Sequence, residues 1–143
     1  MNNPRHNRDL IICICLLSFT LLAACGSRTE KAATPHIDIH TAVATGNEEA
    51  VRQHLAAGTD INAADPFGGS SPLITAAVFG KTEMARLLIE SGADLDFRNK
   101  EGSTALLSAA FFGRPEIVRL LLDAGADKTE KKKYGATAYE SVA

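Results

Sequence analysis

Few residues in this sequence have the types and spacing that chemistry requires. His36 and His40 stand four positions apart, the spacing of two metal ligands on one face of a helix. The sequence contains no G-x-S-x-G motif and no glycine-rich phosphate-binding loop, the common signatures of hydrolases and nucleotide-binding enzymes. Glu48, Glu83 and Glu116 fit the starts of helices, where carboxylates favour the helix dipole. His36 lies at the end of the segment before the first repeat and need not be helical, so the pair does not predict a metal site. We therefore expect no enzyme activity, no cofactor and no metal site.

Cys25 is the other residue with chemical potential, and its surroundings are those of a targeting segment. Arg5 and Arg8 form a short positive region, and residues 10–24 form an uncharged, mostly apolar run. That run is 15 residues long, which is shorter than the roughly 20 residues that a membrane-spanning helix needs. The length is typical of a secretory signal peptide. The sequence therefore predicts that residues 1–24 are removed.

The residues at 22–26, Leu-Ala-Ala-Cys-Gly, resemble the lipobox of bacterial lipoproteins. The resemblance implies diacylation of the Cys25 thiol, cleavage before Cys25 and acylation of the new amino terminus. Several acyl chains on one residue give stable attachment, whereas a single chain binds a membrane marginally. Gly26 resembles the residue found in lipoproteins of the outer membrane, which would place the protein in the cell envelope, facing the periplasm. An uncleaved signal anchor and an ordinary signal peptide with a coincidental cysteine are the alternatives.

The chain that remains after this cleavage is a small, mildly acidic domain behind a tether. It keeps 13 basic and 16 acidic residues, so it has no general electrostatic attraction for nucleic acid. Cys13 and Cys15 leave with the signal peptide, and no disulfide can then form within the remaining chain. Residues 25–35 are mostly small and polar and end in proline, which predicts a flexible tether.

The rest of the chain repeats itself. The sequence SPLITAAVFG at 71–80 returns as TALLSAAFFG at 104–113, and LLIESGADLD at 87–96 returns as LLLDAGADKT at 120–129, both after 33 residues. Segments at 37–46 and 54–63 occupy the same positions 34 residues earlier, and TAYESVA begins a further unit at 137. A period of this length indicates stacked supersecondary units that share one continuous core.

The repeated pattern, a T-P-L-H-x-A-A-like start and an L-L-x-x-G-A-D end, resembles the ankyrin repeat. The resemblance implies an all-α solenoid of helix-turn-helix pairs with β-hairpin loops over residues 36–143. We place the repeats at 37–65, 66–98 and 99–131, with a partial fourth at 132–143. It also implies that His40 makes a structural hydrogen bond.

Each recurring position has a physical reason. Ser71 and Thr104 are suited to cap first helices, and Gly92 is suited to the left-handed turn that ends a second helix. We expect residues 87–89 and 120–122 to form the buried stripe of the second helices. The partial fourth unit contains no second helix, so we expect the apolar face around residues 120–122 to lack part of its cover.

A stacked array of this kind offers a partner its loop tips and the concave face of its first helices. In the family the contact residues lie at fixed positions, and we carry these over as partner-binding predictions. For Phe79 and Phe112 the alternative is packing against their own loops. At the loop tips the predicted residues are Phe67, Lys100, Glu101, Lys133 and Tyr134, and at the concave helix ends they are Val78, Phe79, Phe111 and Phe112.

The function that follows is a non-catalytic, monomeric protein-binding module, lipid-anchored in the bacterial cell envelope and acting as a scaffold or adaptor. The alternative is an inhibitor or immunity-type protein that neutralises a toxic enzyme delivered to the envelope. Both require only a binding face and an anchor, so the sequence does not separate them.

Overall fold

The computed structural model describes residues 35–129, and the statements below concern that part of the chain. It contains three helix pairs: α2 (Ile39–Thr45) with α3 (Glu48–Ala56), α4 (Pro72–Phe79) with α5 (Thr82–Glu90), and α6 (Ala105–Phe111) with α7 (Pro115–Asp123). The predicted signal peptide, Cys25, all of the tether except Pro35, and the predicted fourth repeat lie outside the described residues.

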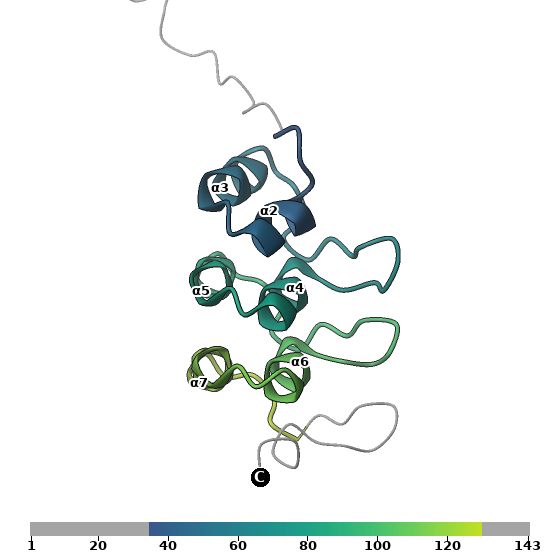
Figure 1. Cartoon of the computed structure of the whole chain (residues 1–143), viewed down its shortest axis with the longest axis vertical. Coiled ribbons are helices and arrows are strands. Elements are labelled where there is room, and N and C mark those ends of the chain that lie inside the picture. The colour runs from purple at the N-terminus through teal and green to yellow at the C-terminus, as the bar shows by residue number, and fades with distance from the viewer. Residues whose placement is uncertain (1–34, 130–143) are drawn as a thin grey trace, which may run out of the picture. The chain divides into compact units, whose positions relative to one another are not determined.

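The helices form two rows, and long loops project from one of them (Figure 1). The first helices α2, α4 and α6 stack on one another, and α5 packs on α7 in the second row. No helix of residues 35–129 is both long and apolar enough to span a bilayer. The all-helical solenoid expected from the sequence is confirmed.

Side-chain caps start the first helices where the sequence predicts them. The Oγ of Ser71 accepts a hydrogen bond from the backbone N–H of Ile74 at 3.3 Å, and Thr104 caps Leu107 in the same way at 3.2 Å. Pro72 follows directly at the first helical position, where a missing N–H costs nothing. Gly92, after α5, has a φ of +88°, the left-handed conformation that favours glycine.

The core runs between the two rows. Leu73, Ile74 and Leu88 are at most 1% exposed, and small alanines such as Ala76 and Ala109 let neighbouring first helices approach closely. Burying a large aliphatic side chain stabilises the fold by about 1.5–3 kcal/mol. The stacked helices therefore hold the loops and the inner surface in place.

The buried stripe of α7 differs from the sequence prediction. Leu121 is buried, but Leu122 is 42% exposed and Leu120 is only partly covered. The deep position one turn earlier is Ile117, at 1% exposed. Successive helical residues point about 100° apart, so Leu122 turns away from the face that Leu121 occupies. In α5, by contrast, Leu87 and Leu88 are both buried and Ile89 packs against the core. The stripe of α7 follows the four-residue spacing from Ile117 to Leu121.

The loops between pairs are hairpin-like turns, and residues 35–129 contain no assigned strand. In the loop before α4 the N–H of Asp65 donates to the carbonyl of Ser70 at 2.9 Å. In the next loop Asn99 donates to Ser103 at 3.1 Å. Such single pairings close each loop but are too short to form a ladder of strands.

Candidate functional site

The loop before α4 is shaped by one carboxylate. Asp65 accepts hydrogen bonds from the backbone N–H groups of Phe67 at 2.8 Å, Gly68 at 2.7 Å and Ser70 at 2.6 Å. Burial raises the pKa of Asp65, but these three donors and the neighbouring His40 outweigh it and hold the pKa below its ordinary value. The result is a tight tip that leaves the side chain of Phe67 90% exposed.

The next loop repeats the arrangement and is tied to the first. Asn99 replaces the aspartate and accepts from the N–H groups of Glu101 at 3.0 Å and Ser103 at 2.9 Å. The Lys100 ammonium donates to the carbonyls of Pro66 and Phe67 at 3.2 Å and 2.9 Å. Lys100 therefore joins neighbouring loop tips, a structural role that the sequence analysis did not assign to it. Glu101 is exposed beside it.

The first helices beneath the loops carry no charged side chain, and exposed aromatic rings lie at their ends. None of the residues of α2, α4 and α6 is Asp, Glu, Lys or Arg. Phe79 is 56% exposed, Phe111 64% and Phe112 47%, so Phe79 and Phe112 leave about half of their surface open to solvent. Aromatic side chains exposed in this way are the kind that contribute most to protein interfaces.

Two hollows lie between the loops and the first helices. The first, of about 330 Å³, is bordered by α2, α4 and the Asp65 loop. The second, of about 350 Å³, is bordered by α4, α6 and both loops. The first brings together His40, Asp65, Thr75, Val78 and Phe79, and the second brings together Val78, Asn99, Glu101, Ser103, Ser108, Phe111 and Phe112.

Four predicted residues thus meet at one place. Val78, Glu101, Phe111 and Phe112 line the second hollow, Phe79 and Val78 line the first, and Val78 is shared by both. The rings of Phe111 and Phe112 stand edge to face, with centroids 5.1 Å apart and planes at 86°.

The remaining predicted residues are placed elsewhere or outside the described part. Phe67 and Lys100 lie at the loop tips and line neither of these hollows, whereas Lys133 and Tyr134 are not among the described residues. Ser103 was not among the predicted residues, although it stands 33 residues after Ser70. That recurrence of serine beside the loop glycines was the available signal.

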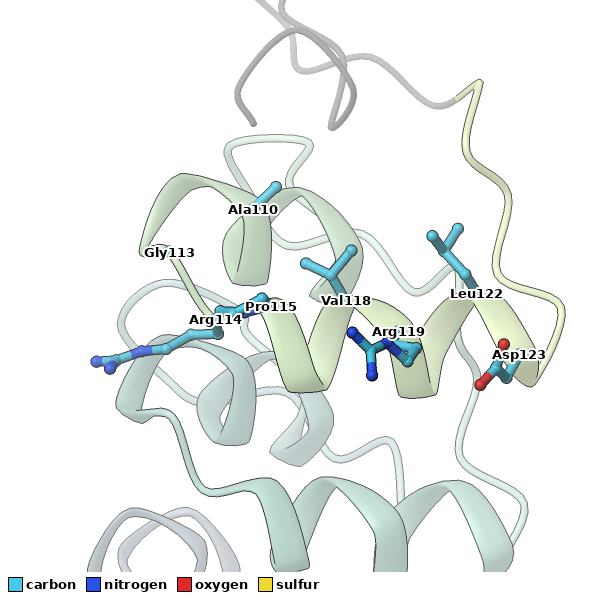
Figure 2. A pocket seen from close by; sticks show the side chains of 8 residues that line it. All are labelled: Ala110, Gly113, Arg114, Pro115, Val118, Arg119, Leu122 and Asp123. Carbon is cyan, nitrogen blue, oxygen red and sulfur yellow. The ribbon is translucent and has the colours of Figure 1, made fainter. Parts of the chain in front are cut away.

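A third hollow, of about 520 Å³, lies at the outer face of the last described helix pair (Figure 2). Ala110 of α6 supplies apolar surface, as do Val118 and Leu122 of α7. Arg119 and Asp123 also lie on α7. One repeat earlier, Ala85 stands at the position of Val118 and is fully buried, and its helix α5 packs against α7. This hollow is therefore the face on which a further repeat would stack.

His40 contacts the neighbouring repeat, whereas His36 does not lie on the same helix. His40 Nδ1 lies 3.2 Å from Thr75 Oγ1 in the next repeat, the kind of contact that the family resemblance implies. His36 is exposed and precedes α2, so it does not share a helical face with His40. Residues 35–129 contain no cluster of three or more His, Cys, Asp or Glu side chains arranged to hold a metal ion.

His54, in α3, is a third histidine. It is 6% exposed; its Nε2 lies 2.7 Å from the carbonyl of Ile37 and its Nδ1 lies 3.2 Å from Thr59 Oγ1. A polar side chain thus ties α3 to the segment that enters the first repeat.

Comparison with known proteins agrees with this architecture. A family profile described as ankyrin repeats (3 copies) matches residues 39–132. A 69-residue stretch, 48% of this chain, is 35% identical to an ankyrin repeat-containing protein of Schizosaccharomyces pombe and covers 32% of it. Another, of 64 residues, is 38% identical to protein phosphatase 1 regulatory subunit 12A of Mus musculus and covers 45% of this chain and 6% of that one.

Among solved structures, the ankyrin repeat domain of Bcl-3, a member of the IkappaB family, superposes with a TM-score of 0.69 at 37% identity. The match covers 72% of this chain and 45% of that one. The matched stretches span about a third or less of the length of the curated relatives, so they establish a shared repeat domain.

Proposed function

This chain belongs to the ankyrin repeat family, whose domains are protein-interaction modules, and from that premise we propose that it binds one protein at a bacterial membrane. Its inner surface, defined by α2, α4, α6 and the loops before α4 and α6, is the proposed binding surface. The observation that carries this proposal is the exposure of Phe79, Phe111 and Phe112 beside two hollows on a surface without helix charges.

The lipid anchor is the second part of the proposal. The lipobox-like sequence around Cys25 supports acylation of its thiol, and the short segment up to residue 35 would keep the repeats close to the bilayer. An extended chain spans at most about 3.3–3.6 Å per residue, so a tether of this length reaches roughly 35 Å. The protein would therefore act as an adaptor that recruits a periplasmic protein to the outer membrane.

The anchor is tested by metabolic labelling with palmitate. The wild-type chain should be labelled and cleaved before Cys25, whereas Cys25→Ser should lose both the label and lipoprotein-type processing. Ser27→Ala, two positions away, serves as the matched control and should leave both unchanged. A Cys25→Ser protein that is still labelled and cleaved at the same site would contradict the anchor assignment.

The binding surface is tested by affinity capture of the full chain from crosslinked cells. We expect one dominant protein with the wild type, and its loss when Phe79, Phe111 and Phe112 are replaced together by serine. Arg86→Ser and Arg52→Ser, on the exposed side of the second helices, form the control set. Equal capture by the serine variant would place the binding surface elsewhere.

A further inference from the structure

We propose that the second hollow receives an arginine side chain of the partner protein. This inference rests on the proposed function and names the chemistry that the surface recognises. Its elements are one carboxylate, a buried hydroxyl and two exposed aromatic rings, supplied by Glu101, Ser103, Phe111 and Phe112.

The hollow has the charge that a cation requires. Glu101 is the only charged residue among those that line it. The neighbouring Lys100 does not neutralise the Glu101 carboxylate in the hollow, because Lys100 does not line it and its ammonium donates to two carbonyls of the preceding loop. The two ion pairs found within residues 35–129, Arg52–Glu48 and Arg86–Glu83, lie on the second helices and do not involve Glu101.

A buried hydroxyl in the hollow lacks a hydrogen-bond partner within the described residues. Ser103 is 3% exposed, and no group in residues 35–129 hydrogen-bonds its Oγ. Its backbone N–H donates to Asn99 Oδ1 at 2.9 Å, which fixes the backbone from which the side chain extends. A buried polar atom without a partner costs free energy. An N–H donor from a ligand would remove that cost.

The aromatic pair favours arginine over lysine. The edge-to-face arrangement of Phe111 and Phe112 leaves ring surface exposed to the hollow and to solvent. A planar guanidinium stacks on an aromatic face and keeps its N–H groups directed outward in its own plane. Those groups can then reach a carboxylate and a hydroxyl together, which a compact ammonium does less well.

The size of the hollow sets what can enter. At about 350 Å³ it is at the lower end of the roughly 300–1,000 Å³ range of ligand sites. It therefore accommodates one long side chain, while Phe79, which lines the first hollow, and Phe67, at the loop tip, remain exposed for contacts with the rest of the partner.

The experiment titrates the full chain, purified in mild detergent, with N-acetyl-arginine amide and follows backbone amide signals by NMR. We expect saturable shifts at Ser103, Phe111 and Phe112, with a dissociation constant on the order of millimolar, as one side chain alone should give. The citrulline analogue, which has the same shape without the charge, should shift these signals little. The lysine analogue should bind several-fold more weakly.

Two variants make the test specific. Glu101→Gln should weaken arginine binding by about tenfold, the loss expected for one charge-assisted contact. Glu83→Gln, an exposed carboxylate of α5, should leave it unchanged. Equal binding of arginine and citrulline, or shifts that do not map to this hollow, would overturn the inference.

The outcome separates this inference from the proposed function. A partner captured through the inner surface by a chain that does not bind arginine would remove only the arginine site. Arginine binding without any captured protein would leave the site and contradict the adaptor role.

Discussion

Replacing Phe111 by alanine tests whether this residue belongs to the binding surface or to the core. Its side chain is 64% exposed, so only about a third of it is covered. Truncating a fully buried phenylalanine costs about 3–5 kcal/mol. A third of that cost gives about 1–2 kcal/mol for Phe111→Ala, including the loss of its edge contact with Phe112.

Leu107 is the matched control, because it lies in the same helix and is 2% exposed. Leu107→Ala should cost about 2–5 kcal/mol, since it leaves a cavity in the core. In a domain of this size each kcal/mol lowers the melting temperature by about 4–8 °C. Phe111→Ala should therefore melt well above Leu107→Ala.

Thermal unfolding followed by circular dichroism measures the loss of stability, and the affinity for the captured partner measures the loss of binding. If Phe111 is a binding residue, Phe111→Ala should weaken the complex by at least about 2 kcal/mol, roughly 30-fold. A melting temperature as low as that of Leu107→Ala, or unchanged affinity, would refute the assignment of Phe111 to the binding surface.

Three further outcomes follow from the described contacts. The pKa of Asp65 is lowered in the folded state, so the stability that its carboxylate contributes is present above the unfolded pKa and should fall as the pH drops below about 4. In urea unfolding between pH 7 and 3, the free energy of unfolding should therefore fall less for Asp65→Asn than for the wild type. An equal fall would contradict the role of the carboxylate. Gly80→Ala and Gly92→Ala should each destabilise the fold by about 1–2 kcal/mol in thermal unfolding, because both glycines have a positive φ. The new Cβ at Gly80 would lie 2.8 Å from the Arg114 guanidinium, the end of a flexible side chain that can move away, so a much larger loss at Gly80 would contradict this reasoning. His54→Ala should cost about 1–3 kcal/mol in urea unfolding, because it removes a buried imidazole and leaves the partly buried Ile37 carbonyl without that partner. A neutral result would show that water replaces the imidazole.

The fold could be predicted from the sequence because the same structural signals recur in each repeat. The caps at Ser71 and Thr104 and the glycine after each second helix recur at a fixed distance, and each has a local physical reason. For Phe79 and Phe112 the sequence did not decide between exposure on the inner surface and packing against a loop, because the same position suits both. That choice depends on how neighbouring repeats are spaced, which a sequence period does not specify.

The contacts between repeats were the other part that sequence reasoning missed. Lys100 was taken as a partner contact from its position, yet its ammonium binds carbonyls 33 and 34 residues earlier. The N–H of Asp94 similarly donates to Asn62 Oδ1 at 2.9 Å, and Asp127 donates to Asp96 in the same way. Each of these bonds has a backbone group as donor or acceptor, and a backbone group is the same in every residue type, so the pairing becomes visible only when the repeats are stacked.

Site-specific photocrosslinking in living cells reports whether the inner surface binds a protein. A photoreactive phenylalanine analogue is placed at position 111, and in a separate strain at position 86 on the exposed side of α5. The account predicts one discrete crosslinked protein from position 111 and none from position 86. The same adduct from both positions, or an adduct from position 86 alone, would contradict it.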